Sequence, residues 1–519
     1  RISYIEGTLL RYVPEEDDWA AIVKDTPFGA GDALYSDKDA KAEFILPNNT
    51  WVRIGGDTQI QFIVLKRDIT EIDVASSVAR FYNRSSDALI RAVTPFGHVI
   101  APEGTSFEIN VGNESVEVEA LEGRIFFVDE TTKTRYEVIA GSSSIVANTR
   151  RVTSGDGYED FRWDAWNMKR DRLWANRLGI KRESVKHLPV WLYNDAYALE
   201  AHGLWGRVYY DGAYRYFWRP AHVRVGWAPF TFGRWTVWHG DNTWIPYEPF
   251  GYVTHHYGHW VFLDGFWYWA PPAVRIRAHA RRPWIHTGFA WYPGKVVWIN
   301  FGVYLGWVPL APGEPYYCNR RWGPRAIVAK DVHPSRTHLH INRYRNSNRA
   351  VIIRRNNFYG AGDYRNISIQ YKNHARFSER YHVAPVINDK MIRNAAGIKK
   401  HHLFSNSPLV RKPSRAVLRR IRKKEYFVAQ HANLSADQIR LNFKENSLGR
   451  VSKEKVEKKA IGKHKRMVSN QVVRRASQGG FKREKLEGGK ETTGRNPAPD
   501  KKRTGRLRRK ASASPASQQ

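Results

Sequence analysis

The sequence has almost no cysteine and no long apolar run, and each deficit excludes a class of protein. The single cysteine, Cys318, cannot form an internal disulfide, a Cys-paired zinc site or a Cys-x-x-Cys-His haem attachment. No stretch holds about 20 consecutive apolar residues, the length that a membrane-spanning helix needs. The nearest stretch, 296–312, is interrupted by Asn300, two glycines and two prolines, so it predicts strands and not a transmembrane span.

The usual sequence signatures of catalysis are also missing. The chain contains no G-x-S-x-G, no P-loop and no G-x-G-x-x-G after a strand. A glycosidase pair drawn from scattered carboxylates stays open on sequence grounds, with Glu200, Asp211, Asp241, Glu248 and Asp264 as the available side chains. We nevertheless expect a protein that is not an enzyme and that binds no cofactor.

The formal net charge of +34 is distributed very unevenly along the chain. Residues 1–150 hold 15 Lys+Arg against 24 Asp+Glu, whereas residues 151–320 hold 20 against 13. Residues 321–519 hold 49 against 13, so the excess of positive charge belongs to the last part of the chain alone. Binding to polyanions is therefore expected of that part only.

Residues 1–150 predict an antiparallel β-domain. Apolar and polar residues alternate in "AEFILPNNTWVRIGG" (42–56) and in "SFEINVGNESVEVEALEGRIFFV" (106–128), with turn residues between the runs. Alternation with one polar face is typical of half-buried antiparallel strands, and the spacing of the turns indicates a sandwich or roll.

Residues 158–182 change to a helical period. Trp163, Trp166, Leu173, Trp174 and Leu178 fall near one helical face, and acidic residues precede basic ones, as the helix dipole favours. We expect a linker helix whose tryptophans pack on a neighbouring module, with a partner-binding face as the alternative.

Residues 203–320 predict a module of aromatic β-repeats. The stretch 203–310 holds 13 of the 20 tryptophans. "WGRV" (205–208), "FGRW" (232–235) and "YGHW" (257–260) align, and each is followed by Trp-x-Pro, at 218–220, 244–246 and 269–271. "WYP" (291–293) and "WVP" (307–309) look like further copies. Each unit fits a hairpin with a turn at "DGA", "HGDN" or "LDG". A single hairpin cannot bury its own apolar face, whereas stacked hairpins can.

The remaining residues complete a mainly β fold class. Residues 321–390 are a mixed extension in which 350–360 predicts a strand running into a turn. Residues 391–519 are basic and poor in aromatics, which predicts a largely disordered C-terminal tail. The expected order is an antiparallel β-domain (1–150), a linker helix (158–182), stacked aromatic β-hairpin repeats (203–320), the extension and the tail.

Two parts of the chain resemble known families. "GDALYSDKDAKAEFILPNNTWVRIGGDTQIQF" (31–62), "TPFGHVIAPEGTSFEINV" (94–111), "VEVEALEGRIFFV" (116–128) and "AGSSSIV" (140–146) resemble the FecR-type domain of bacterial envelope proteins. "DAWNMKRDR" (164–172), "GWAPFTFGRW" (226–235), "YEPFGYVTHHYGHW" (247–260) and "YLGWVPLAP" (304–312) resemble the Trp/Tyr-Gly-repeat domain of unknown function that follows it in some Gram-negative secreted proteins. The resemblance implies an exported protein with a cleaved signal peptide, located in the periplasm, at the outer surface or outside the cell.

The aromatic module offers a candidate glycan-binding face. Exposed indole and phenol rings stack on the CH faces of sugars, and neighbouring polar side chains hydrogen-bond to hydroxyl groups. The candidates are Trp238, Asp241, Trp244, Tyr247 and Trp267. The alternative is that the repeated rings form the core of the module, which repetition favours because a structural unit must repeat its packing. Rings that are not repeated, such as Trp238, are expected nearer the surface.

His255, His256 and His259 have H-H-x-x-H spacing, and on a helix His255 and His259 would share a face that could hold zinc. The surrounding pattern predicts a strand, in which His255 and His259 stand about 13 Å apart. We therefore expect ordinary packing or surface histidines and no metal site.

The tail offers candidate polyanion-binding residues, and they form two clusters. The candidates are Arg411, Lys412, Arg415, Arg419, Arg420, Arg422, Lys423, Lys424, Lys501, Lys502, Arg503, Arg506, Arg508, Arg509 and Lys510. Polysaccharide, lipid headgroups, nucleic acid or the chain's own acidic N-terminal domain are possible partners of such charge.

Three classes of function remain open from the sequence. The leading hypothesis is a non-enzymatic envelope or extracellular-matrix scaffold that binds glycans or polyanions and self-assembles through edge strands and opposite end charges. The first alternative is a FecR-like signalling module that binds a partner receptor. The second is a nucleic-acid-binding protein that acts through the tail.

Overall fold

The computed structural model of the chain describes most of residues 1–369 and short segments beyond them. The described residues are 1–13, 18–157, 159–179, 183–272, 291–320, 322, 326–328, 343–359, 362–369, 419–421, 428, 431–443 and 448–452. Within this part of the chain the fold is mainly β, as the sequence predicts. None of the helices described there combines the length and the hydropathy needed to cross a membrane.

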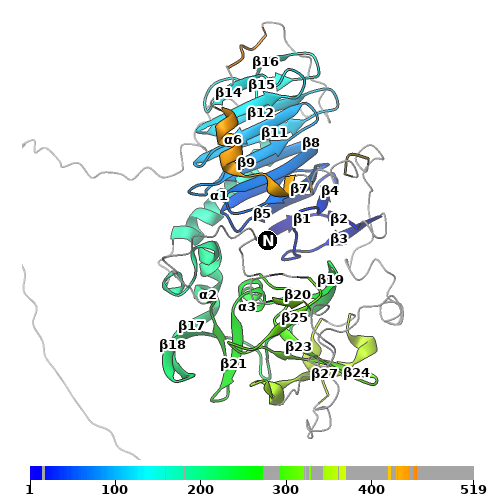
Figure 1. Ribbon diagram of the computed structural model, residues 1–519, viewed down its shortest axis with the longest axis vertical. Coiled ribbons are helices and arrows are strands. Elements are labelled where there is room, and N and C mark those ends of the chain that lie inside the picture. The colour runs from blue at the N-terminus through cyan, green and yellow to red at the C-terminus, as the bar shows by residue number, and fades with distance from the viewer. Residues whose placement is uncertain are drawn as a thin grey trace, which may run out of the picture. The chain divides into compact units, whose positions relative to one another are not determined.

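Residues 2–155 form two β-sheets that share one long, bent strand, β8 (Figure 1). Sheet A contains β1 (Ile2–Glu6), β5 (Lys41–Ile45), β6 (Thr50–Ile54), the second half of β8 (Ile69–Asn83), β11 (Thr105–Val111), β12 (Val116–Glu122), β15 (Ser144–Ala147) and β16 (Val152–Gly155). Sheet B contains β3 (Asp18–Ile22), β2 (Leu9–Val13), β4 (Ala33–Ser36), β7 (Gln59–Leu65), the first half of β8, β9 (Leu89–Val93), β10 (Gly97–Ala101), β13 (Arg124–Asp129) and β14 (Arg135–Ile139). The predicted antiparallel architecture is confirmed, with one parallel pair, β8–β9.

The core of these sheets lies between them. Alternate residues of both sheets point inward, including Phe44, Phe81 and Phe107 of sheet A and Phe62 and Phe127 of sheet B, and all are wholly buried. The period-two pattern of the sequence therefore identifies the inner faces correctly. The prediction that the outer faces meet solvent is wrong over much of their area, because other segments cover them.

Helix α1 (Phe161–Gly179) covers the outer face of sheet A, as its Trp stripe predicts. Trp163 and Trp174 are buried, and the Trp174 indole meets Trp51 of β6 at 4.7 Å between ring centroids. Trp163 Nε1 donates a hydrogen bond to Glu108 of β11 at 2.8 Å. The polar residues of sheet A, which an isolated sheet would expose, therefore become partners of this helix.

A short segment leads from α1 to the aromatic module. It contains the 3-10 helices η2 (Ser184–Lys186) and η3 (Val190–Asp195) and the helix α2 (Ala196–His202). The described residues of the module then form four hairpins: β17 (Gly203–Tyr210) with β18 (Ala213–Pro220), β19 (Gly233–Trp238) with β20 (Asp241–Pro246), β21 (His259–Leu263) with β22 (Phe266–Ala270), and β23 (Val296–Phe301) with β24 (Tyr304–Pro309). The strands β25 (Tyr316–Cys318), β26 (Ala326–Val328) and β27 (Val351–Arg354) follow, with 3-10 turns η7 (Ser347–Arg349), η8 (Arg355–Asn357) and η9 (Tyr364–Asn366).

A tryptophan pair lies directly across each hairpin. The pairs are Trp205 with Trp218, Trp235 with Trp244, Trp260 with Trp269, and Trp298 with Trp307. Of these, the rings from Trp218 to Trp307 join one buried cluster, against which Trp205 packs. This cluster explains why single hairpins of five to eight residues per strand are stable, because each supplies rings to a shared core.

The repeat has a different phase from the one that the sequence alignment predicts. The structural unit is Gly-x-Trp followed by Trp-x-Pro, so "GLW" (203–205) aligns with "GRW" (233–235) and "GHW" (258–260). A Cβ on Gly203 would lie 2.4 Å from the Trp218 ring, and one on Gly233 would lie 2.6 Å from the Trp244 ring. Glycine recurs there because the opposite indole lies flat on the backbone. "WVP" (307–309) is a true copy in β24, whereas "WYP" (291–293) precedes β23 and lies outside the strands.

Residues of the predicted tail lie on the outer face of sheet B and at the strands β14 and β16. They are residues 419–421, 428, 431–443 and 448–452, which include η12 (His431–Asn433) and α6 (Ala436–Phe443), drawn in orange in Figure 1. The prediction of a largely disordered tail therefore does not hold for these residues. The other residues of 391–519 lie outside the described part of the chain.

Candidate binding surface

The structure places four of the five predicted glycan-binding residues in the interior. Trp238, Asp241, Trp244 and Trp267 are at most 8% exposed, and Tyr247 alone is substantially exposed, at 44%. The expectation that Trp238 lies near the surface is wrong. A sugar cannot stack on a buried indole, so these residues do not form a common face for a ligand.

Trp238 and Asp241 have structural partners instead. The Trp238 ring stacks on Trp322 at 4.9 Å between centroids. Asp241 accepts hydrogen bonds from Trp322 Nε1 at 2.5 Å and from the backbone N–H groups of Asn319 and Arg320 at 2.8 and 3.1 Å. Burial raises the pKa of Asp241, and these three donors oppose the rise. The carboxylate therefore fixes the segment after β25 against the turn of the β19–β20 hairpin.

Two of the three H-H-x-x-H histidines lie on a helix, which corrects the strand prediction for this stretch. Helix α3 (Gly251–His256) forms because Phe250, Val253 and Tyr257 recur at helical spacing and all face the aromatic core. His255 and His256 are buried, and burial lowers their pKa values to about 3 and about 4. His255 Nε2 accepts a hydrogen bond from the Phe230 N–H at 3.1 Å, which is the pattern of a packed neutral imidazole.

Glu248 is the most perturbed carboxyl group of the module. It is 6% exposed, and burial raises its pKa to about 7 although Trp227 Nε1 donates a hydrogen bond to it at 2.9 Å. Among the described residues no group of three or more histidine, cysteine or acidic side chains could hold a metal ion. The donor of its hydrogen bond, Trp227, belongs to the buried aromatic cluster of the module.

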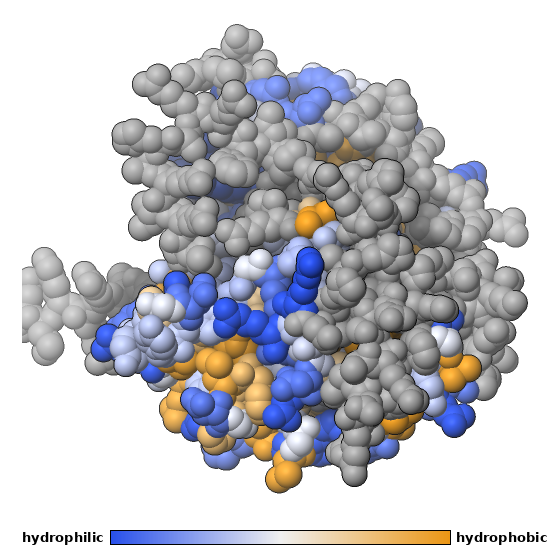
Figure 2. Space-filling model, turned by 60° about the horizontal axis from the view of Figure 1, so that its bottom comes forward, coloured by the Kyte–Doolittle hydropathy of each residue, from blue (hydrophilic) through white to orange (hydrophobic). Residues whose placement is uncertain are grey.

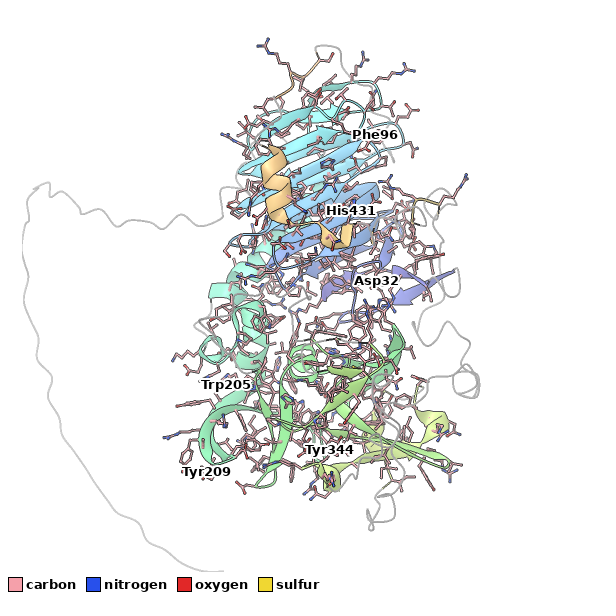
Figure 3. The ribbon with its side chains drawn as sticks, in the orientation of Figure 1. Asp32, Phe96, Trp205, Tyr209, Tyr344 and His431 are labelled. Atoms are coloured by element: carbon pink, nitrogen blue, oxygen red, sulfur yellow. The ribbon has the colours of Figure 1, made fainter. Side chains whose placement is uncertain are left out.

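Three of the five exposed rings described in the module lie on the β17–β18 hairpin, whereas Tyr247 and Phe266 lie elsewhere. With Trp205 these three rings form a set that we call the aromatic strip: Trp205, Tyr209, Tyr214 and Tyr216. Tyr209 and Tyr214 are each 62% exposed and Tyr216 is 52% exposed, whereas Trp205 is partly buried at the base of the hairpin. Figure 3 labels Trp205 near the base and Tyr209 further toward the tip.

The backbone register places these four rings on one face. Tyr209 lies opposite Tyr214, Arg207 lies opposite Tyr216, and Trp205 lies opposite the buried Trp218. Residues two apart on a strand share a face, so the strip alternates with side chains of the other face. The turn at Asp211 and Gly212 has positive φ at both residues, 52° and 77°, which is the two-residue turn that keeps hairpin strands in register.

Neighbouring side chains hold the strip in place. The His187 ring lies 4.4 Å from the Trp205 ring and 4.7 Å from the Tyr216 ring, and it stacks on the latter. Trp205 Nε1 donates a hydrogen bond to Ser184 Oγ at 2.8 Å. Arg207 lies over the Tyr214 ring at 4.4 Å, and Tyr209 meets Tyr214 edge to face at 5.3 Å. The rings are therefore positioned before any ligand arrives.

The charged side chains beside the strip are partly paired with each other. Lys186 forms an ion pair with Glu183 at 2.6 Å, and Arg345 lies 3.4 Å from Asp211 at the turn. Arg207 adds one cation over a ring. Figure 2, which brings this end of the molecule forward, shows apolar and polar residues intermixed on the surface. The hairpin as a whole is net positive, with Arg207, Arg215 and Arg219 against Asp211. By the register, Arg215 and Arg219 lie on the other face, so Arg207 is the one charged strand residue of the hairpin on the strip face.

A sequence signal for this strip exists, although the repeat alignment missed it. The tryptophans of the other three hairpins are nine residues apart, at 235 and 244, 260 and 269, and 298 and 307. Trp205 and Trp218 are 13 residues apart, so the first hairpin is two residues longer on each strand. Those extra residues place Tyr209 and Tyr214 beyond the shared core, where their rings are exposed and do not contribute to its packing.

Only two of the polyanion-binding candidates are described. Arg419 is exposed, whereas Arg420 donates two hydrogen bonds to Asp73 of β8, at 2.9 and 2.5 Å. Arg420 is therefore engaged by the acidic β-domain of its own chain, one of the partners that the charge distribution predicts. The other thirteen candidates lie outside the described residues.

Comparison with known proteins gives one family match. The model of a family of unknown function, DUF6600, matches residues 196–314, which hold α2, the four hairpins and the aromatic strip. That match lies outside residues 1–150, whose resemblance to the FecR-type domain remains a prediction. No curated protein matches the chain.

Two crystal structures of a candidate anti-sigma factor from Parabacteroides distasonis ATCC 8503 show a weak likeness to the chain. They are 17% and 18% identical to it over 26% of its length, with a TM-score of 0.22 in both cases. The match spans 64% of the length of that protein. A likeness at this level carries no argument about fold or function.

Proposed function

We propose that the chain is a non-enzymatic binding protein of the bacterial envelope or extracellular matrix, and that its aromatic strip holds a neutral glycan. One observation carries this proposal. Three tyrosine rings, each more than half exposed, lie on one face of a hairpin that extends past the core of its module.

Exposed rings that are fixed in position favour binding over packing. Contiguous apolar surface is uncommon on soluble proteins and marks interaction sites. Tyrosine offers a broad apolar face and a hydroxyl, and it loses little conformational freedom on binding because it has two side-chain torsions. His187 and Arg207 already restrict Tyr216 and Tyr214, which reduces that loss further.

The low charge of the strip face itself, where Arg207 is the one charged strand residue of the hairpin, favours a neutral glycan over a nucleic acid. Proteins that stack nucleobases on aromatic rings also line the path of the backbone with positive charge. The strip instead has the Lys186–Glu183 and Arg345–Asp211 pairs beside it. The alternating hydroxyl and ring surfaces suit the alternating hydroxyl and CH surfaces of a sugar.

The location of the protein is part of the proposal and rests on the resemblance of residues 1–150 to FecR-type domains. We also propose that the tail binds polyanions or a neighbouring copy of the chain. This attachment would make the protein a scaffold. Two alternatives remain. The first is a FecR-like signalling module that binds a partner receptor, and the second is a protein that binds nucleic acid through its tail. The strip does not distinguish scaffold from signalling module, because both would display a binding surface.

A glycan array tests the proposed function. The full chain is compared with a Tyr209→Ala/Tyr214→Ala variant and with Leu204→Ala, a matched control that removes a 66% exposed side chain from the other face of β17. We expect the wild type and the control to bind the same neutral glycans, and the double variant to lose them. Equal binding by all three proteins, or binding to charged glycans alone, would contradict the proposal.

A further inference from the structure

The outer face of sheet B has buried side chains that need a covering partner. Around β7, β8 and β9 it presents an apolar set and an acidic set. The apolar set is Ile63, Val64, Ile69, Leu89 and Ile100, all at most 6% exposed, and the acidic set includes Glu71 and Asp73, at most 1% exposed. We call this surface the docking face. It is covered by the described residues 419–421, 428 and 431–443. Together with residues 448–452, which lie at β14 and β16, we call them the docking segment.

Two apolar anchors attach the docking segment. Ile421 is 1% exposed and lies in a cluster with Leu10, Tyr12 and Trp19 of β2 and β3. Further along, Ile439 of α6 lies in the apolar set of the docking face together with Ala436. Residues 436 and 439 are neighbours on one helix face, so α6 contacts the sheet along an apolar side.

The polar contacts are charged and specific. Arg420 binds Asp73 through two nitrogens, and the Asp73 side chain is wholly buried. His431 Nδ1 lies 2.9 Å from a Glu71 carboxylate oxygen, and Arg91 binds the same carboxylate at 3.0 Å. Glu71 and Asp73 therefore receive some of their hydrogen-bond partners from a segment about 350 residues away in sequence.

Backbone groups of the segment and of the β-domain also take part in the contact. Asp68 accepts a hydrogen bond from the Ala436 N–H in the first turn of α6, at 2.9 Å, where a carboxylate also complements the helix dipole. Lys66 Nζ donates to the Leu434 carbonyl at 2.7 Å, and Arg440 donates to the Asp87 carbonyl at 2.8 Å. These contacts define a register for the segment on the face.

The end of the segment covers two sheet edges. β14 and β16 are the terminal strands of the path through the joined sheets. Leu448 bridges to Arg135 in β14, and Ser452 bridges to Thr153 in β16. An uncovered edge strand has unpaired backbone groups that bind other chains. The docking segment thus protects the places where copies of this β-domain would otherwise pair.

The covalent connection does not require the segment to bind its own chain. Residues 370–418, 49 in number, separate Ile369 from Arg419. A connection of that length spans about 160 Å at full extension, far more than the width of a domain. Its effective concentration favours docking within the chain in dilute solution, and a second copy competes when the protein is concentrated.

We propose that the docking segment is exchangeable, so that it binds the docking face of a second copy in the same register as its own. Every copy carries one acidic face and one basic segment, so exchange needs no new interface. Reciprocal exchange gives a closed dimer, and exchange in one direction gives a chain of copies. This surface, rather than charge attraction in general, then determines self-assembly.

Thiol cross-linking tests the exchange with little effect on folding. Asp87→Cys is made in one full-length chain and Arg440→Cys in another, because Arg440 contacts Asp87 and both side chains are exposed. The native Cys318 is buried. The two variants are mixed and treated with a short thiol-to-thiol reagent. We expect an interchain product whose share increases with protein concentration, and an intrachain product when both cysteines are placed in one chain.

Two controls make the outcome decisive. Asp87→Cys mixed with Tyr247→Cys reports random collisions, since Tyr247 belongs to the aromatic module. Adding Arg420→Asp to both partners should reduce the interchain product about tenfold or more, because it places like charges at the Asp73 contact. An intrachain product in the double-cysteine chain, with no interchain product above the collision control at any concentration, would overturn the proposal.

Discussion

Arg53 Nε lies 2.9 Å from a carboxylate oxygen of Glu43, and both side chains are wholly buried beneath α1. The same carboxylate accepts hydrogen bonds from Arg170 at 2.5 Å and from Trp174 Nε1 at 2.8 Å, both on the helix. Ser3 Oγ adds a further hydrogen bond at 2.6 Å. Glu43 therefore joins sheet A to α1. Loss of its charge removes the carboxylate that Arg170 and Arg53 share and leaves Arg53 with Asp171 at 2.8 Å.

Glu43→Gln is expected to lower the free energy of unfolding by about 3 to 5 kcal/mol at pH 7. Burial opposes ionisation of Glu43, but Arg53 and Arg170 outweigh it and lower its pKa from 4.5 to about 2. Its stabilising contribution is therefore complete above the unfolded pKa of 4.5 and is lost as the pH falls toward 2. Denaturant unfolding of wild type and variant at pH 7 and pH 3 measures this difference.

A surface pair supplies the matched control for Glu43. Glu137 forms an ion pair with Arg124 on the β13–β14 hairpin, and the Arg124 side chain is 60% exposed. Glu137→Gln should change the free energy of unfolding by about 1 kcal/mol or less. If Glu43→Gln were as mild as Glu137→Gln at pH 7, the network under α1 would not be what attaches the helix.

Glu248→Gln should stabilise the protein, in the opposite direction from Glu43→Gln. Burial raises the pKa of Glu248 from 4.5 to about 7, so the unfolded carboxyl loses its proton at a lower pH than the folded one. The resulting penalty on folding is absent below pH 4.5, grows up to about pH 7 and is constant above it. Glutamine removes this penalty, which is worth up to about 3 kcal/mol at pH 8.

Thermal unfolding at two pH values checks the role of Glu248. The variant should unfold at a higher temperature than the wild type at pH 8, and at nearly the same temperature at pH 4. Glutamine keeps an oxygen that can accept the hydrogen bond from Trp227 Nε1, so the packing of that indole is retained. An equal shift at both pH values would mean that the effect does not come from ionisation.

Gly203→Ala tests the corrected phase of the aromatic repeat. The new methyl group would lie 2.4 Å from both the Trp218 ring and the Arg219 carbonyl oxygen. We expect a loss of about 1 to 3 kcal/mol, the usual cost of overpacking a tight core. Gly206→Ala is the control in the same strand, because nothing lies within 4 Å of its added methyl group. Equal stability of the two variants would show that the indole does not lie on the backbone at Gly203.

The sequence predicts the layers of this fold better than it predicts what covers them. Alternation identified Phe44 and Phe107 as inward residues because the hydrophobic effect acts on each strand locally. It could not show that Glu43 or Asp73 is buried, because their partners, Arg170 and Arg420, lie far along the chain. Long-range ion pairs leave no periodic trace in a single sequence.

The binding surface was misplaced for a related reason. In the sequence, Trp244 and Trp267 cannot be told apart from tryptophans that are exposed. They are buried because several hairpins pack their rings into one cluster, and that packing is visible only in the folded structure. The two extra residues per strand between Trp205 and Trp218 were visible in the sequence but lacked meaning before the correct repeat phase was known. Helix α3 was missed because its six residues are too few for helical periodicity to be distinct from the flanking strands.

The most direct test of the account is calorimetric titration of the full chain with the strongest neutral glycan from the array, at low and high salt. Wild type and Tyr216→Ala are compared, because Tyr216 stacks on His187 and occupies the middle of the strip. The account predicts binding that is insensitive to salt and about tenfold weaker in the variant, a loss typical of one stacked ring. Binding that disappears at high salt and is unchanged in Tyr216→Ala would contradict it, and would assign recognition to charge outside the strip.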